Sequence, residues 1–339
     1  MLKHKISSLI LLSLLSLPLL LTAAKPSSFA VKSALQPRGI FVGELQEKWQ
    51  FPSDHLPIGM TFENFHFISW NVLDADFMSW VIEKNSQGLS RSMIAKEHVY
   101  LDHSKLTLRD QHIATLILDT LSHPVYPRSI VALQECNEAF LAELRLRIPS
   151  HFELLSSHGE ALLLDKRLFE IVSVKEVSGI FTSDSRRTVQ EVIVRHHGTS
   201  LRLINVHLPG DPTKPGRFEF SNYLSQTFDP ALTTIAMGDM NFNELEMSEA
   251  LKQAFKNSSP FALYSPYCTN ISPVLFYSKA IDHFLIYCPQ GHSPHLSHPH
   301  EIMPGLASIV ALLEEPTSLF LPQGILNLME GRFILPRRE

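Results

Sequence analysis

The chain has 339 residues, of which 45% are hydrophobic and 19% are charged, so it is long and apolar enough to bury a large core. Its formal net charge of −5 excludes a strongly basic field over the whole chain and leaves nucleic acid only a local basic groove. The 3 cysteines are too widely spaced for a zinc pattern or a disulfide framework. A Cys268–Cys288 disulfide can form if the compartment is oxidising. Cys136 is interpreted as a small core residue.

The first 24 residues predict a secretory signal peptide. Lys3 and Lys5 precede the apolar stretch 6–21, and residues 22–24 are small enough for cleavage. The apolar stretch is short for a bilayer span, which takes about 20 residues. We therefore expect an exported protein, secreted or periplasmic, with an uncleaved membrane anchor as the alternative.

Strands dominate the rest of the chain, with helices between some of them. Residues 25–60 contain prolines and are expected to form an irregular lead-in. Helices are predicted at 108–121, where the apolar residues follow helical spacing, and at 138–148. Short apolar or alternating runs predict strands at 65–73, 129–135, 160–165, 169–177, 188–197, 201–209, 233–239 and 279–288. This order favours an α/β (α+β) sandwich over a helical bundle or a purely parallel wound sheet.

Several predicted strands end in polar residues. Such groups are costly to bury unless they are paired or functional. Each alone has an ordinary reading: a turn residue, a helix N-terminal acid or a satisfied core histidine. Together they suggest that the strands bring their ends to one site. These residues are Asn71, Glu135, His207, Asp239, Asn241 and Asp282.

The residue types in this set favour phosphate-ester chemistry. Glu135 and Asp239 offer the hard oxygen ligands that Mg²⁺ or Mn²⁺ prefers. Asn71 and Asn241 can hold a phosphate oxygen, and His207 can carry a proton or stabilise negative charge. The chain has no glycine-rich loop followed by lysine, which argues against a nucleotide-dependent motor or kinase.

The motifs also resemble a known family. WN at 70–71, IVALQE at 130–135, INVHL at 204–208, MGDMN at 237–241 and AIDHFLI at 280–286 occur in the order seen in the endonuclease/exonuclease/phosphatase superfamily. Any one motif is weak, but five in order, each at a predicted strand end, are specific. The resemblance covers residues 65–288. It implies a deoxyribonuclease I-like four-layer sandwich, two mixed β-sheets between helices, with the site at one edge.

The resemblance also implies a role for each residue. Glu135 would be the main metal ligand, with Asn71 and Asp239 completing the metal site. His207 would stabilise the phosphoryl oxygens or act as an acid, Asp239 would position or activate the attacking water, and Asn241 would hold the phosphate. Asp282 would brace a histidine or the metal. Arg109 is interpreted as structural, and His283 as packing or bonding locally.

The chain departs from the family pattern at its C-terminal motif, which is usually Ser-Asp-His. The corresponding stretch, 292–305, contains no Asp. His300 fits the histidine position best and His298 competes with it, so both are candidate catalytic residues. Either another acid such as Glu301 replaces the missing partner, or activity is reduced or lost. The histidines of this stretch also permit a separate transition-metal site, His292, His295, His298 and His300.

We therefore expect an exported phosphodiesterase, dependent on Mg²⁺ or Mn²⁺, in which water attacks phosphorus without a covalent enzyme intermediate. The substrate would be a nucleic acid or a phospholipid head group, with membrane proximity, and the protein a monomer. The predicted domain spans 61–310, and 311–339 is an extension without a recognisable motif. The alternatives are a catalytically degenerate family member that acts as a binding protein, and a His-rich metal-binding surface protein.

Overall fold

The structure is a computed structural model. It describes residues 53, 55, 57–77, 106–122, 128–182, 184–211, 213, 215–265, 270–272, 277–291 and 295–297. The predicted leader, the C-terminal extension, Cys268 and both candidate C-terminal histidines, His298 and His300, lie outside these residues.

The first sheet has six strands in the order β14-β1-β2-β3-β5-β4. Its β2–β3 pair is parallel, and its other pairs are antiparallel. The sheet is therefore mixed, as expected. Its strands are β1 (Ile58–Phe62), β2 (Phe65–Asn71), β3 (Ser129–Gln134), β4 (Phe152–Ser157), β5 (Glu160–Asp165) and β14 (His295–Ser297).

The second sheet also has six strands, in the order β10-β13-β9-β8-β7-β6. It too has one parallel pair, β8–β9, among antiparallel pairs. Its strands are β6 (Glu170–Val177), β7 (Val189–His196), β8 (Thr199–His207), β9 (Thr233–Asp239), β10 (Ala262–Tyr264) and β13 (Asp282–Tyr287). A separate two-stranded ribbon pairs β11 (Asn270–Ser272) with β12 (Tyr277–Lys279).

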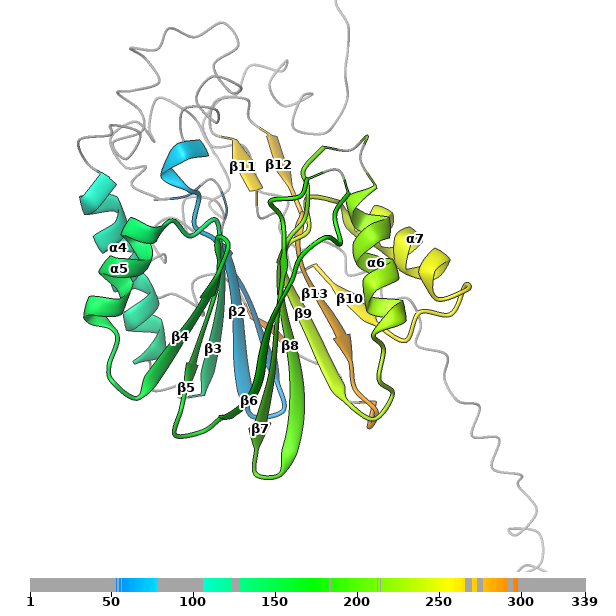
Figure 1. Ribbon diagram of the computed structural model, residues 1–339, viewed down its shortest axis with the longest axis horizontal. Coiled ribbons are helices and arrows are strands. Elements are labelled where there is room, and N and C mark those ends of the chain that lie inside the picture. The colour runs from blue at the N-terminus through cyan, green and yellow to red at the C-terminus, as the bar shows by residue number, and fades with distance from the viewer. Residues whose placement is uncertain are drawn as a thin grey trace, which may run out of the picture. The chain divides into compact units, whose positions relative to one another are not determined.

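Helices cover the outer faces of both sheets, which gives the four layers that were expected (Figure 1). In the described part of the chain, two helices lie against the first sheet and two against the second. None of the helices in the described ranges is both long and apolar enough to cross a membrane. The helices are α4 (Leu106–Leu121), α5 (Glu138–Arg147), α6 (Gly216–Gln226) and α7 (Glu244–Ala254).

The alternation of side chains along β8 shows how the layers are built. Leu201 and Leu203 point into the core between the sheets, whereas Ile204 and Val206 point to the layer beneath α6 and α7. All four side chains are buried. Successive residues of a strand face opposite sides, so one apolar run can serve two cores.

Buried polar groups also join the two sheets. Asn205 on β8 donates from Nδ2 to the carbonyl oxygens of Leu133 and Ala161, at 3.0 and 3.1 Å. The side chain of Gln134 donates to Asn205 Oδ1 at 2.7 Å. Asn205 is thus a structural link between the sheets, close to the strand ends that carry the candidate site.

The fold class is confirmed, but several elements differ from expectation. The helices α6 and α7 and the strands β1, β4, β10, β11, β12 and β14 were not predicted. The lead-in, expected to be irregular through residue 60, contains the start of β1 at Ile58. Predicted strand 65–73 ends at Asn71, since the backbone of Leu73 leaves the extended conformation with φ 61°, and predicted strand 279–288 begins at Asp282, since Lys279 belongs to β12.

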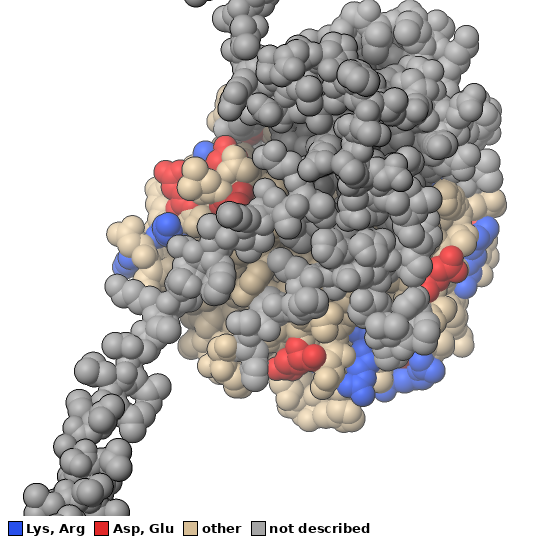
Figure 2. Space-filling view, turned by 180° about the vertical axis from the view of Figure 1, so that it is seen from behind, with Lys and Arg blue, Asp and Glu red and all other residues tan. Residues whose placement is uncertain are grey.

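Charge on the surface agrees with the near-neutral composition. Figure 2 shows acidic and basic side chains in small separate groups on the visible described surface, with uncharged residues between them. On that face the described residues form no continuous basic surface.

Candidate active site

The register of the second sheet sets three site residues in a row. His207 on β8 lies beside Asp239 on the parallel β9, and Asp239 lies beside Asp282 on the antiparallel β13. In the first sheet, Asn71 on β2 pairs with Gln134 on β3, so that Glu135 follows directly. Because β2 packs on β9, the two sets of strand ends face each other. The predicted convergence of these residues is therefore observed.

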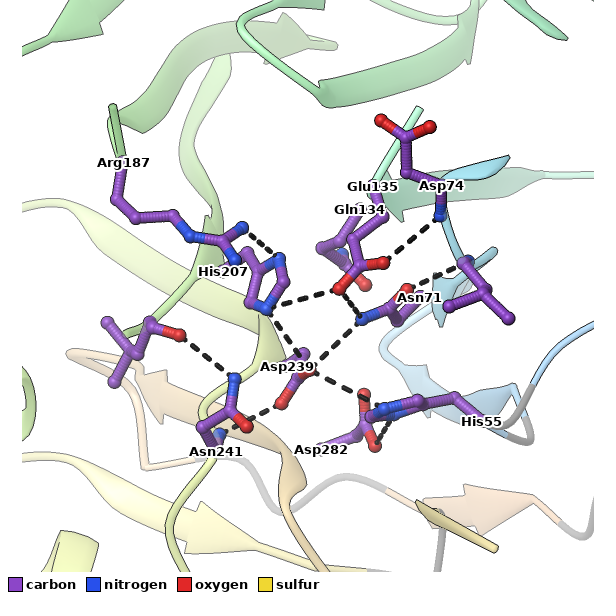
Figure 3. A network of polar contacts seen from close by, with 12 residues as sticks. His55, Asn71, Asp74, Gln134, Glu135, Arg187, His207, Asp239, Asn241 and Asp282 are labelled. Carbon is purple, nitrogen blue, oxygen red and sulfur yellow. Dashed lines mark hydrogen bonds and ion pairs between the residues drawn. The ribbon is translucent and has the colours of Figure 1, made fainter. Parts of the chain in front are cut away.

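Asn71 links the two carboxylates that were predicted to hold metal. Its Nδ2 donates to Glu135 Oε1 at 3.0 Å and to Asp239 Oδ2 at 3.1 Å (Figure 3). Its Oδ1 accepts from the backbone N–H of Leu73 at 2.9 Å. That backbone bond fixes which end of the amide faces the acids. Asn71 therefore positions the carboxylates through its nitrogen, and its oxygen points away from them.

Three residues around the site hold left-handed backbone conformations. Glu135 has φ 59°, Leu73 has φ 61° and Asn241 has φ 55°. Such conformations cost free energy for residues other than glycine, and they persist where the surrounding structure enforces them. At Glu135 the carboxylate is held by the N–H of Asp74, which donates to Oε2 at 3.1 Å. The turn after β3 thus aims Glu135 at Asp239.

His207 is a buried imidazole whose tautomer is set by Arg187. A guanidinium only donates hydrogen bonds, so the contact from Arg187 Nη1 makes His207 Nδ1 the acceptor. The proton then sits on Nε2, which lies 3.5 Å from Glu135 Oε1 and 3.4 Å from Asp239 Oδ2. Burial, and after it the charge of Arg187, holds the pKa of His207 well below its usual range. His207 is thus a neutral donor aimed at the acids.

Asp239 lies at the end of β9 and organises the turn that follows. Its Oδ1 accepts from the backbone N–H of Asn241 at 2.9 Å. Asn241 Nδ2 donates to the carbonyl oxygen of Leu208 at 2.9 Å, which ties the turn to the end of β8. Asn241 therefore lies next to Asp239, as predicted, with its amide nitrogen engaged by the backbone.

The electrostatics of the acids fit a divalent cation. Burial, reinforced by Asp282 and Glu135, raises the pKa of Asp239 to about 7 although His55 and Asn71 oppose the shift. Ligand atoms of Glu135, His207 and Asp239 all lie within 4.8 Å of one another. Converging carboxylates whose mutual repulsion raises a pKa are a donor set for Mg²⁺ or Mn²⁺. Since His207 presents a protonated nitrogen, Glu135 and Asp239 are the residues that would hold the ion.

One site residue, His55, was missed by the sequence reasoning. Its Nδ1 lies 2.9 Å from Asp282 Oδ2, and its Nε2 lies 3.6 Å from Asp239 Oδ2 (Figure 3). His55 lies before β1, within the expected irregular lead-in, where no spacing or strand pattern marks it. Arg187 was also missed, and the adjacent arginines at 186–187 before a strand were its only signal.

Two further residues have the local roles expected of them. Arg109 is buried on α4 and donates to the carbonyl oxygens of Val72 and Leu73, which supports the turn after β2. His283 is buried on β13, and its Nε2 lies 2.6 Å from the carbonyl oxygen of Phe242. Neither contact involves the acids of the site.

No protein-family model matches the chain, and no curated protein matches its sequence. Solved structures do match. A D. rerio TDP2 humanized by 14 mutations has 16% identity and a TM-score of 0.48, over 71% of this chain and 86% of that one. The mannosyl-6-phosphatase Bt3783 of Bacteroides thetaiotaomicron VPI-5482 has 15% identity and a TM-score of 0.42, over 55% and 81%. An endonuclease/exonuclease/phosphatase family protein from Leptotrichia buccalis C-1013-b has 14% identity and a TM-score of 0.39, over 56% and 84%.

Proposed function

We propose that this protein is a divalent-metal-dependent phosphoesterase that hydrolyses a phosphodiester by attack of water on phosphorus. One observation carries the proposal. A single amide, Asn71 Nδ2, draws Glu135 and Asp239 together from facing sheets, beside the protonated nitrogen of His207. Metal-dependent hydrolysis of a phosphate ester requires acids that hold the cation and donors that meet the developing charge, and this set supplies both.

Each residue has a distinct task in this proposal. Glu135 and Asp239 would hold Mg²⁺ or Mn²⁺, which when bound polarises a phosphoryl oxygen. His207 donates from Nε2 to a phosphoryl oxygen, and Arg187 keeps that nitrogen protonated. Asp239 orients the attacking water, and Asn241 supports Asp239 through its backbone N–H. Water attacks directly, and no covalent enzyme intermediate forms.

The substrate and the location of the protein are part of the same proposal. Export, inferred from the leader, favours an extracellular nucleic acid or a phospholipid head group as substrate. The net charge of −5 favours the phospholipid, because tight binding of nucleic acid draws on many Lys and Arg contacts. We propose a monomer that works near a membrane surface. The N-terminal sequence of the mature protein would reveal whether the leader is cleaved.

The test is hydrolysis of four substrates by the purified protein: duplex DNA, RNA, sphingomyelin and an inositol polyphosphate. Each is offered with Mg²⁺, with Mn²⁺ and with EDTA. We expect metal-dependent cleavage of one class. Glu135→Gln keeps the shape of the side chain but removes its charge, and should lower turnover on the order of 10²–10³-fold.

Two outcomes would contradict the proposal. Full turnover by Glu135→Gln would mean that Glu135 does not hold the metal and that hydrolysis occurs at another site. No cleavage of any substrate by a folded protein with metal present would favour a degenerate member that acts by binding. A matched control is Glu138→Gln, an exposed acid three positions along the chain on α5, which should retain full turnover.

A further inference from the structure

His55 lies outside the five sequence motifs, and none of them predicts that it belongs to the site. The residue is buried, with 4% of its surface exposed, between two buried acids on neighbouring strands. Its Nδ1 is 2.9 Å from Asp282 Oδ2, and its Nε2 is 3.6 Å from Asp239 Oδ2. Burying an imidazole between carboxylates costs free energy unless the pairing is structurally or chemically useful.

The backbone of this segment is fixed by the end of β2. Trp70 donates from its indole Nε1 to the carbonyl oxygen of His55 at 2.9 Å. The N–H of His55 donates to Ser53 Oγ at 3.1 Å, and that hydroxyl donates to the carbonyl oxygen of Asn71 at 2.7 Å. The residues that place His55 are therefore the two that carry the Trp-Asn motif. Such anchoring holds an imidazole in one orientation.

The contact with Asp282 sets the tautomer of His55. A carboxylate accepts hydrogen bonds, so Nδ1 carries a proton, and in the neutral form of His55 it is Nε2 that carries the lone pair. Nε2 faces Asp239, the acid assigned to the attacking water. His207, on the other side of Asp239, has the opposite tautomer because Arg187 donates to its Nδ1. His55 thus accepts at Nε2, whereas His207 donates from Nε2.

We propose that His55 is the catalytic imidazole that takes the proton of the attacking water, and that Asp282 is its positioning residue. The inference rests on the proposed phosphoesterase function. The water oxygen forms a bond to phosphorus, and the bond between phosphorus and the ester oxygen breaks. A proton of the water passes to His55 Nε2, while the leaving oxygen takes a proton from solvent. His55 then returns its proton to solvent.

In this proposal the catalytic imidazole comes from the segment before β1 and not from the C-terminal stretch. The C-terminal stretch lacks the usual acid before its histidine, and His55 lies 2.9 Å from Asp282. The N-terminal segment would therefore do what the sequence led us to expect of His300 or His298.

Steady-state kinetics with added imidazole test the proposal. His55→Ala should lower kcat by about 10²–10⁴-fold with little change in KM, and free imidazole should restore part of it. Asp282→Asn should also lower kcat, but imidazole should not restore it, because the positioning carboxylate is missing. The double variant should be little worse than either single one. His158→Ala removes an exposed histidine on the β4–β5 turn and should behave as the unaltered protein.

A second measurement does not depend on turnover. Long-range proton–nitrogen spectra of ¹⁵N-histidine-labelled protein should show His55 protonated on Nδ1 and His207 protonated on Nε2. His55→Gln, a milder change than alanine, assigns the His55 signals. In the same samples Mn²⁺ binding should survive His55→Gln and fail in Glu135→Gln.

The outcomes separate the inference from the function on which it rests. If the protein is active and His55→Ala keeps full kcat, the role of His55 is overturned but the phosphoesterase function is not. Loss of turnover in His300→Ala would strengthen that result. Loss of Mn²⁺ binding in His55→Gln would make His55 a metal ligand and overturn it as well. An unaltered protein without activity would overturn both, and His55 protonated on Nε2 would overturn the inference alone.

Discussion

At the scale of single residues, Asn71 has two roles that its position explains. Its amide nitrogen joins Glu135 to Asp239, and its oxygen is fixed by the backbone of Leu73. The main-chain carbonyl oxygen of Asn71 accepts a hydrogen bond from the Ser53 hydroxyl, which itself accepts from the N–H of His55. Asn71 therefore also helps to place His55. A side chain with only donors or only acceptors could not make both side-chain contacts, which explains why an asparagine stands here.

Glu160 is a buried acid outside the site, and it predicts how stability depends on pH. Burial raises the pKa of Glu160 to about 8, while Arg187 and the Thr188 hydroxyl only partly offset the shift. Between the ordinary pKa of a glutamate and about 8, Glu160 is therefore protonated in the folded state and ionised in the unfolded state. Stability from this group is complete below that ordinary pKa and is lost as the pH rises through about 8.

Glu160→Gln should remove this dependence, because glutamine stays neutral. Between about pH 5 and about pH 9 we expect the variant to gain about 2–5 kcal/mol in unfolding free energy relative to the unaltered protein. Urea unfolding of both proteins across this range measures the difference. Parallel curves at every pH would show that Glu160 is already ionised in the folded state.

At the scale of elements, the site depends on the close approach of β8 and β9. Gly238 on β9 has φ 151°, and a Cβ there would lie 1.8 Å from the carbonyl oxygen of Val206. Only glycine permits this pairing, which brings the next residues, His207 and Asp239, side by side. The Gly-Asp pair of the motif thus has a packing reason as well as a chemical one.

Gly238→Ala should therefore destabilise the protein by about 3 kcal/mol or more, because the strands must separate. Gly198→Ala, in the turn between β7 and β8, is the matched control. It also has a positive φ but no atom within 4 Å of the added Cβ, and should cost about 1 kcal/mol. Denaturant midpoints distinguish the two. Equal losses would show that β8 and β9 can shift without cost.

Burial explains only part of which elements were predicted, because β6 was predicted although none of its residues is fully buried, and β1 was missed although four of its five residues are. Strands such as β3, β5 and β9 are buried along their whole length, and their continuous apolar runs are easy to recognise. β4 is half-buried, and α6 begins with glycine and mixes aromatic with polar residues, so neither has a clear period. The helix α7 did carry a signal, the Asn243–Glu246 capping box, which was overlooked.

The candidate site was predictable to the extent that its residues follow strands. Glu135, His207 and Asp239 are marked by a change from apolar to polar residues. His55 follows no strand, and its partners lie 15 and 227 positions away, a relation that only the folded chain creates. Arg187 acts through the tautomer of His207, which spacing along a sequence does not reveal.

At the scale of the whole molecule, the distance between the facing strand ends depends on the link through Asn205. Its buried side chain binds carbonyl oxygens of β3 and β5 and also accepts from Gln134. Asn205→Leu would leave these partners buried and unsatisfied, at about 2–4 kcal/mol of unfolding free energy. Since the site residues come from both sheets, turnover should fall as well.

A double variant provides the control for this prediction. Replacing Gln134 by leucine together with Asn205 removes both ends of the 2.7 Å hydrogen bond. The combined loss of stability, measured by urea unfolding, should be smaller than the sum of the two single losses. Simple additivity would mean that the two side chains stabilise the sheets independently.

The contact between His55 and Asp282 also has a consequence for biosynthesis. It joins residues 227 positions apart, and closing a loop of that length costs about 5 kcal/mol of chain entropy from the length term alone. A ribosome that has not yet translated Asp282 therefore carries a nascent chain whose imidazole lacks the carboxylate that receives its Nδ1 proton. Fragments released before that point would be inert, so the proposed hydrolase would come into being only once synthesis of its sheets is complete.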